Sequence, residues 1–352
     1  MPDTNIFGNT KHQLEELFES LGEPRYRGRQ VFKWLYQRGC IDFQAMTDLP
    51  QPLRDRRVQQ YTINRLLLEE QARSTDGTEK YLFRLEDKHP IETVLIPVSD
   101  QERTTVCISS QAGCALACRF CATGTMGLLR NLTVGEIVGQ LLFLRDRSGA
   151  DAFTNVVMMG MGEPLHNYDN VVEALRIMTD PDGLALGSKR ITLSTSGITP
   201  KIRKLAESGL NVRLALSLHA ATQEKRLQIM PVAETFALEK LMAAVRDYAA
   251  TVRDRVTFEY VLMTDFNDSM ADIKALARLV EGIDCKINVM AYNPVPGLDF
   301  DRPDADRVDW FGRELASRVP AVTVRKSRGR DIDAACGQLA ARRTHTGVGN
   351  DA

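Results

Sequence analysis

The spacing of hydrophobic and polar residues predicts two different kinds of secondary structure in the first hundred residues. Residues 1–61 carry apolar side chains at helical spacing in three segments, 10–22, 26–39 and 46–60. Gly22 and Gly39 follow the first two segments and are typical helix stops. Residues 62–100 change to β-rich runs around an Asp76-Gly77 pair, which predicts a hairpin or small sheet. We therefore expect a helical module at 1–61 and a β-rich connector at 62–100.

A third pattern extends from residue 101 to 342, where short apolar runs alternate with amphipathic helical segments. The expected strands are 104–109, 155–163, 190–197, 212–219, 256–263 and 286–294. The expected helices are 133–147, 167–180, 198–209, 237–252 and 270–282. This alternation predicts an α/β fold with a parallel sheet, closed in part as a (β/α)6 barrel. Active sites of such barrels lie at the C-terminal ends of the strands. Residues 343–352 form a loose tail without such a pattern.

Composition is that of a soluble globular protein. The 352 residues are 43% apolar and 26% charged, with a formal net charge of -1. No apolar run is long enough to span a bilayer, and the N-terminus lacks the apolar core of a signal peptide. We therefore expect a cytoplasmic protein without a membrane partner. That reducing compartment argues against structural disulfides among the seven cysteines.

A basic, aromatic stretch at 24–39 has two interpretations. It combines five arginine or lysine residues with four aromatic residues, a composition suited to contacts with nucleic acid. It is equally compatible with an amphipathic helix that buries Val31, Trp34 and Leu35 and leaves its arginines in water.

Four of the seven cysteines lie within residues 107–121. Cys114, Cys118 and Cys121 stand in a C-x3-C-x2-C spacing. A structural zinc site prefers four ligands, and the sequence offers no second pair. A disulfide conflicts with the expected compartment. Three thiolates on one loop can hold three irons of a 4Fe-4S cluster and leave the fourth iron open to a ligand, and this interpretation is favoured over zinc.

Six motifs then agree in order with one known family. They are CISSQAGCALACRFCATG (107–124), VVMMGMGEPL (156–165), TLSTSG (192–197), LSLHA (216–220), AYNPVPG (291–297) and DIDAACGQLA (331–340). Together these motifs resemble the RlmN/Cfr family of radical S-adenosylmethionine (SAM) RNA adenine methyltransferases. The resemblance runs from about residue 11 to 340, including the helical module. It implies that this module at 1–61 binds RNA, with the 24–39 stretch as the candidate contact.

The resemblance implies two cofactors. Cys114, Cys118 and Cys121 would hold one 4Fe-4S cluster, whose open iron binds SAM and cleaves it to a 5'-deoxyadenosyl radical. Two SAM molecules would be used in each turnover. The implied SAM contacts are Gly162, Glu163, Ser194, Ser217, Leu218, His219 and Asn293.

The resemblance also implies three catalytic residues. Cys336 is methylated by one SAM, and the radical from the second SAM activates that S-methyl group for addition to adenine. Cys107 then attacks the sulfur of Cys336, releasing the methylated base and forming a transient disulfide. Glu92 matches the base that removes the ring proton. Taken alone, the two cysteines would be interpreted as packing residues and Glu92 as a surface carboxylate.

The implied substrate is an adenine of 23S rRNA, with tRNA beside the anticodon as a second candidate. Pro164 and Ser196 resemble the subgroup that methylates carbon 2; methylation of carbon 8, which confers antibiotic resistance, is the alternative. We expect a monomer that receives electrons from a donor such as flavodoxin. An RNA-binding protein stapled by a cluster, or a radical SAM enzyme acting on a small molecule, would not explain the motif order.

The segment that carries Cys336 leads to two further expectations. Cys336 must serve both SAM and Cys107, so we expect residues 327–331 to be flexible. Arg325, Arg328 and Arg330 are close in sequence, and we expect them to lower the pKa of the Cys336 thiol.

Overall fold

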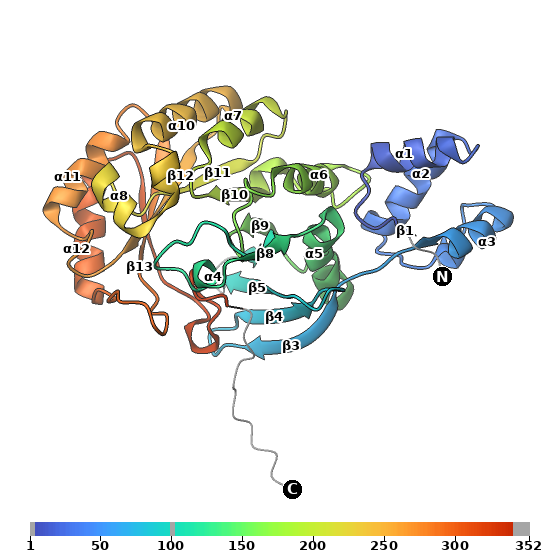
Figure 1. Cartoon of the computed structure of the whole chain (residues 1–352), viewed down its shortest axis with the longest axis horizontal. Helices are drawn as coiled ribbons and strands as arrows, with labels where there is room; N and C mark the ends of the chain where they lie inside the picture. Colours follow the sequence, from blue (N-terminus) through green and yellow to red (C-terminus); the bar gives the residue numbers. More distant parts are fainter. Residues whose placement is uncertain (1–3, 99–102, 341–352) are drawn as a thin grey trace, which may run out of the picture.

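The computed structural model describes residues 4–98 and 103–340. Its centre is one ten-stranded sheet in the order β14-β13-β12-β11-β10-β9-β6-β5-β4-β3 (Figure 1). Seven neighbouring strands are parallel: β6 (Arg103–Cys107), β9 (Asn155–Met158), β10 (Ile191–Thr195), β11 (Arg213–Ser217), β12 (Val256–Leu262), β13 (Cys285–Ala291) and β14 (Val322–Arg325). The expected α/β fold of a partial barrel is confirmed, with β14 as a strand beyond the six predicted.

The β-rich connector is an extension of this same sheet. Strands β3 (Leu67–Arg73), β4 (Glu79–Arg84) and β5 (Pro90–Val98) are antiparallel, and β5 pairs with β6. The Asp76-Gly77 pair forms the predicted turn between β3 and β4, with Gly77 at a φ of 85°. The prediction of a hairpin is confirmed, but its sheet continues into the parallel strands.

Helices follow the parallel strands, as the alternating pattern predicts (Figure 1). They are α5 (Val134–Ser148), α6 (Tyr168–Thr179), α7 (Thr199–Glu207), α10 (Leu238–Val252) and α11 (Met270–Leu279). Three further helices were not predicted from the sequence: α8 (Gln223–Ile229), α9 (Val232–Thr235) and α12 (Ala305–Ala316). Helix α5 begins with a capping box, in which Thr133 and Glu136 satisfy each other's backbone N–H groups.

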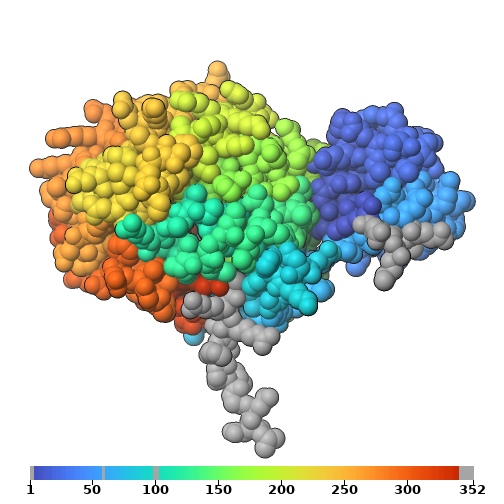
Figure 2. Space-filling model, in the orientation of Figure 1, coloured from blue at the N-terminus to red at the C-terminus, as the bar shows by residue number. Residues whose placement is uncertain are grey.

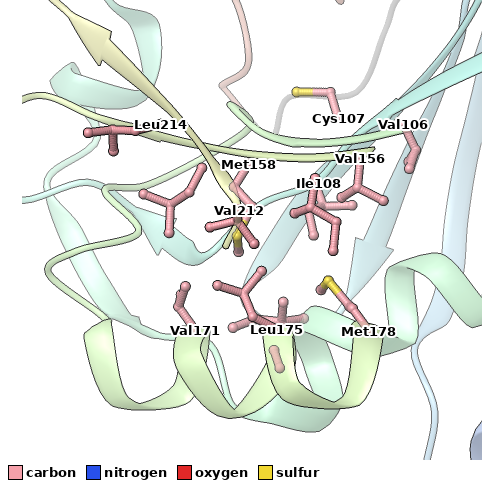
Figure 3. Packing of buried hydrophobic residues seen from close by; sticks show 14 of the residues in the cluster. Val106, Cys107, Ile108, Val156, Met158, Val171, Leu175, Met178, Val212 and Leu214 are labelled. Atoms are coloured by element: carbon pink, nitrogen blue, oxygen red, sulfur yellow. The ribbon is translucent and has the colours of Figure 1, made fainter. Parts of the chain in front are cut away.

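Alternation along β6 separates the packing face of the sheet from the inner face. The side chains of Val106 and Ile108 point toward Leu175 and Met178 of α6, whereas Cys107 points away from that helix (Figure 3). Successive residues of a strand face opposite sides, so a single cysteine between two core residues is presented to the interior of the barrel.

The N-terminal helices form a lobe beside the barrel (Figures 1 and 2). They are α1 (Lys11–Ser20), α2 (Arg25–Phe32), a π-helical turn η1 (Lys33–Gln37), a 3-10 turn η2 (Phe43–Ala45) and α3 (Gln51–Gln60). Short strands β1 (Thr4–Asn5) and β2 (Tyr61–Thr62) pair in parallel at its base. The lobe shares one continuous apolar core with the barrel.

Across the described parts of the chain, no helix is long and apolar enough to cross a membrane.

Candidate functional site

The three-cysteine motif lies in a loop that a small hairpin closes. Strand β7 (Gln111–Gly113) pairs antiparallel with β8 (Leu128–Asn131), and the Cys114 N–H donates to the carbonyl of Gly127. The loop enters a short helix, α4 (Ala122–Thr125), directly after Cys121. The motif therefore follows the C-terminal end of β6, which is where active sites of β/α barrels lie.

A cavity of about 220 Å³ opens on the inner face of the sheet beside this loop. Ten of the thirteen predicted site residues line it: Cys107, Cys114, Cys118, Cys121, Gly162, Glu163, Ser194, Ser217, His219 and Cys336. Leu218, Asn293 and Glu92 do not line it. The structure therefore brings residues from opposite ends of the chain to one place.

Gly162 and Glu163 follow β9 in a tight turn against Gln111. A Cβ on Gly162 would lie 2.5 Å from the Gln111 side chain, and its φ of 102° also favours glycine. The Glu163 carboxylate accepts from the backbone N–H groups of Leu165 (3.0 Å) and Ser196 (2.7 Å). Burial nevertheless raises the pKa of Glu163, and these hydrogen bonds oppose the rise. The carboxylate is thus fixed at the edge of the cavity.

His219 is buried at the end of the segment after β11. Its ring packs edge-on against Phe120, with ring centroids 4.8 Å apart, and its Nδ1 accepts from the Val261 N–H. Burial, together with the nearby Arg226, lowers the pKa of His219 to about 3. The imidazole is therefore neutral at physiological pH. Beside it, the hydroxyls of Ser194 and Ser217 lie 3.3 Å apart on neighbouring strands.

Two predicted SAM contacts lie behind the cavity wall. Leu218 is fully buried, and its backbone N–H donates to the carbonyl of Glu259. Asn293 donates from Nδ2 to the carbonyl of Cys336 (3.1 Å) and accepts from Arg302. In this structure Asn293 therefore holds the loop that carries Cys336.

Glu92 is fully buried in β5 and forms an ion pair with Lys80, with Oε1 and Nζ 3.1 Å apart. The interpretation of Glu92 as a surface carboxylate is wrong. Val94 pairs with Cys107 across the two strands, so Glu92, two residues away, faces the same side of the sheet as Cys107.

Cys107 and Cys336 lie close enough to interact electrostatically. Burial raises the pKa of the Cys107 thiol to about 12, and Cys336 contributes to the rise. The pKa of Cys336 is also raised to about 12, by burial and by Cys121 and Glu259, while Arg325 opposes it only in part. The expected low-pKa thiol is thus wrong for this structure. Cys336 still exposes its surface, because it faces the cavity.

The segment around Cys336 is held at two places. Near its start, Asp331 accepts from the Ser74 hydroxyl (2.6 Å) and the Thr75 N–H, and Asp76 accepts from the Gly329 N–H (2.9 Å). We call these contacts of Asp76 and Asp331 the hairpin latch. Arg328 lines the same cavity as Cys336 and donates to the Asp76 carbonyl.

Beyond Cys336 the loop is tied to the cysteine motif. The Ala122 N–H donates to the carbonyl of Gly337 (2.8 Å), and the Thr123 hydroxyl donates to that of Leu339 (2.6 Å). The segment expected to be flexible is therefore anchored on both sides in this structure.

Two buried charged residues, one lining the cavity and one close to its wall, were not foreseen as site residues. Glu259 of β12 lines the cavity; it accepts from Asn288 (2.8 Å) and faces Arg325 at 4.0 Å. Arg226 of α8 is buried beside Cys118. Arg226 stands on a short polar helix, a pattern that usually places charges in water, so the sequence carried no signal for its burial. Glu259 lies within the apolar run 256–263, and a carboxylate inside a predicted buried strand is the signal that could have identified it.

The cysteine loop suits a multi-iron cluster better than a single ion. In residues 4–98 and 103–340, no three His, Cys, Asp or Glu side chains converge where one metal ion could be held. A 4Fe-4S cluster requires no such convergence, because each of three irons takes its own thiolate. Burial raises the pKa of Cys118, and Cys121 and Cys114 add to the rise, as expected of neighbouring thiols that need metal to become thiolates together.

Comparison with known proteins matches both parts of the chain. The Radical SAM superfamily model matches residues 108–280, and the model of the ribosomal RNA large subunit methyltransferase N-terminal domain matches residues 4–63. Dual-specificity RNA methyltransferase RlmN of Rhodospirillum rubrum is 46% identical over 95% of this chain and 80% of its own length. The RlmN of Syntrophobacter fumaroxidans is 45% identical over 94% of this chain and 96% of its own length.

A solved structure agrees over nearly the whole chain. The crystal structure of a radical SAM methyltransferase from Sphaerobacter thermophilus has a TM-score of 0.89 and 44% sequence identity. It covers 96% of this chain and 100% of its own. Identity at this level over both the helical lobe and the barrel, together with the cysteine loop at the cavity, shows the family: this chain belongs to the RlmN family of radical SAM RNA methyltransferases.

Proposed function

We propose that this enzyme methylates carbon 2 of an adenine in large-subunit ribosomal RNA, and of an adenine in tRNA. Cys336 carries the methyl group, and Cys107 releases the product. Family membership implies a 4Fe-4S cluster and SAM, and the proposal assigns two SAM molecules to each turnover.

One observation carries this proposal. Cys107 and Cys336 are more than two hundred residues apart in sequence, yet both line the cavity that the three cysteines of the motif also line. A cluster that only stabilised the fold would not require two further thiols in the same cavity. A methyl carrier and a resolving thiol must meet in one cavity, which supports their assignment.

The two thiols act in succession. Cys336 attacks the methyl group of the first SAM, forming an S–CH3 bond and releasing S-adenosylhomocysteine. After the methylene carbon has been joined to the base, Cys107 attacks the sulfur of Cys336. The S–S bond forms, the S–C bond breaks, and its electron pair stays on the carbon, which takes up a proton. A cellular thiol then reduces the disulfide.

Other residues of the cavity bind and orient. A 4Fe-4S cluster at Cys114, Cys118 and Cys121 would supply the 5'-deoxyadenosyl radical from SAM. Glu163 offers a fixed carboxylate to the SAM ammonium group, and the hydroxyls of Ser194 and Ser217 are suited to its ribose. The neutral ring of His219 adds an apolar wall without a competing charge.

Glu92 is the proposed base for the proton on carbon 2. Its support is the strand register, which turns its side chain to the same face as Cys107. Glu92 does not line the cavity in this structure, so the role requires the neighbouring segments to move when RNA binds. Extrusion of the target base from its stack is the general route by which a base reaches such a site.

Mass spectrometry of methylated RNA tests the proposal. Reconstituted enzyme is incubated with 23S rRNA or tRNA, SAM and a reductant, and the product nucleosides are identified. We expect one methyl group on carbon 2 of one adenine in each RNA. The Cys336→Ala variant should give none, whereas Cys285→Ala, which removes a buried thiol of β13 away from the cavity, should give the full amount.

The outcomes separate the parts of the proposal. A methyl group on carbon 8 would contradict the regiochemistry and keep the two-cysteine mechanism. Methylation by Cys336→Ala would overturn the role of the methyl carrier. An enzyme that cleaves SAM but leaves both RNAs unmethylated would overturn the proposed substrates.

A further inference from the structure

Arg226 is a fully buried arginine to which the mechanism above gives no role. Only 1% of it is exposed, and it lies on the short helix α8. Its Nη1 donates to the carbonyls of Ser217 (3.0 Å) and Leu218 (2.7 Å), and its Nη2 donates to that of Ser196. These carbonyls stand at the cavity ends of β10 and β11. Arg226 therefore links the ends of β10 and β11, next to the proposed SAM contacts Ser194 and Ser217.

Within the described residues, the charge of Arg226 has no ion-pair partner of its own. Its guanidinium binds backbone carbonyls and the Met230 sulfur, and its Nε has no hydrogen-bond partner. Burial lowers the pKa of Arg226 to about 10, and the acidic groups Cys118 and Glu163 oppose this lowering only in part. Both Glu163 oxygens already accept from backbone N–H groups. An uncompensated buried cation costs several kcal/mol, so this site is suited to an additional anion.

Helix α8 packs directly against the cysteine loop. The Arg119 N–H donates to the carbonyl of Ile229 (2.9 Å). Phe120, Ile229 and Met230 form an apolar cluster that Cys118 and Cys121 border. Arg226 also contacts the sulfur of Met230 at 3.2 Å. The segment that carries Arg226 therefore packs against the proposed cluster site, and Met230 joins the guanidinium to that packing.

The charge of a cluster at this loop complements that of Arg226. An oxidised 4Fe-4S core carries a charge of about +2, so three thiolates make the whole about -1, and one added electron makes it about -2. A fixed cation in a low-dielectric site stabilises the more negative state more strongly. Such a cluster would have to be reduced before it could supply an electron to SAM.

We propose that Arg226 is a positioning residue whose buried positive charge favours reduction of the cluster, while its backbone hydrogen bonds hold the strand ends at the SAM site. The inference rests on a cluster at Cys114, Cys118 and Cys121. It is independent of which RNA is methylated, because its test uses no RNA.

The test is a redox titration of the reconstituted cluster followed by electron paramagnetic resonance. The Arg226→Met variant should be harder to reduce, with the ratio of reduced to oxidised cluster at a fixed potential lowered roughly tenfold or more. Arg226→Lys keeps the charge but loses hydrogen bonds, so it should stay near the wild-type ratio and bind SAM several-fold more weakly. Arg203→Met removes a half-exposed arginine of the outer helix α7, paired with Asp247, and should change neither quantity.

Cluster content, measured as iron and sulfide per chain, is determined for every variant. A full cluster in Arg226→Met with the wild-type ratio of reduced to oxidised forms would overturn the role of the charge. If Arg226→Met does not fold, Arg226→Lys decides: a cluster that is tenfold harder to reduce despite the retained charge contradicts the proposal. Loss of the cluster in Cys118→Ala but not in Cys285→Ala checks the premise separately.

Discussion

Cys107 shows how one residue can satisfy two interpretations at once. It is 8% exposed and belongs to the apolar core, as a packing residue would. It also lines the cavity, on the face opposite its neighbours Val106 and Ile108 (Figure 3). The alternation of β6 is therefore sufficient to place a thiol at the cavity inside the barrel while its neighbours pack in the core.

Replacing Cys107 should separate methyl transfer from product release. In Cys107→Ala, Cys336 can still join the RNA, but no thiol remains to break the S–C bond. We expect a covalent RNA–protein adduct that survives denaturing gel electrophoresis, with product formation falling about a hundredfold or more. Cys285→Ala serves as the control and should form no adduct. Release of methylated RNA at the normal rate by Cys107→Ala would contradict the assignment.

At the residue scale, the sequence predicted those site residues whose position depends on the motif in which they stand. The glycine at 162 was foreseen by the motif and has a local cause, since any Cβ would strike Gln111. Arg226 was not foreseen, because an arginine in a short polar helix is normally exposed. Its burial depends on the distant strand ends and the cysteine loop, and no local pattern encodes those contacts.

At the scale of elements, buried parallel strands were predictable because they are short continuous apolar runs between helices. Strand β14 was missed, since its four residues are partly or fully exposed and offer no such run. Helix α12 did carry a signal: Val308, Phe311 and Leu315 are buried at helical spacing. The contact between the β3–β4 turn and the Cys336 loop could not be predicted, because it joins segments about 250 residues apart.

The hairpin latch should control the mobility of the Cys336 loop. In Asp331→Ala, the hydrogen bonds to Ser74 and Thr75 are lost. We expect amide hydrogen exchange in residues 326–340 to accelerate roughly fivefold, with little change in the melting temperature. Asp309→Ala on the outer helix α12 is a suitable control. Unchanged exchange in this segment would show that the latch does not hold the loop.

The latch should also respond to acid in a defined window. Burial opposes ionisation of Asp76, but hydrogen bonds from Thr78 and Gly329 prevail and lower its pKa from 3.8 to about 2. A carboxyl whose pKa is depressed in the folded state stabilises it above pH 4 and loses that contribution as the pH falls toward 2. The latch is therefore insensitive to pH in the physiological range.

At the scale of the whole molecule, most of the positive charges in the 24–39 stretch of the helical lobe form ion pairs with carboxylates of the protein itself. Val31 and Leu35 of the 24–39 stretch are buried, as predicted, and Trp34 is half-buried. Three of its five cations bind carboxylates, namely Arg25, Arg29 and Lys33. Lys33 reaches Asp182 of the barrel, as does Lys11 of α1. These pairs fix the lobe and leave fewer cations for RNA.

Arg27 and Arg38 are the remaining cations of the stretch, and they are the proposed RNA contacts. Each lies over an aromatic ring, Arg27 at 4.7 Å from the Tyr26 centroid and Arg38 at 4.0 Å from that of Trp34. We expect the double variant Arg27→Ala, Arg38→Ala to bind RNA about tenfold more weakly, with a smaller salt dependence, because two phosphate contacts are lost. Filter binding at several salt concentrations measures both.

Matched measurements identify the cause of that loss. SAM cleavage without RNA should be unchanged in the double variant, and Arg313→Ala on α12, far from the lobe (Figure 1), should bind RNA normally. Equal RNA binding by the double variant and the wild type would assign the stretch to packing alone.

The length of the turn between β3 and β4 affects the position of the loop that carries Cys336. Surface turns generally accept insertions and deletions, since few contacts depend on their length. Here Ser74, Thr75 and Asp76 hold the loop that carries Cys336, so an added residue would leave the sheet intact and displace the Cys336 thiol. We therefore expect the turn to tolerate changes of its exposed side chains but not of its length, as if a solvent-exposed hairpin belonged to the cavity.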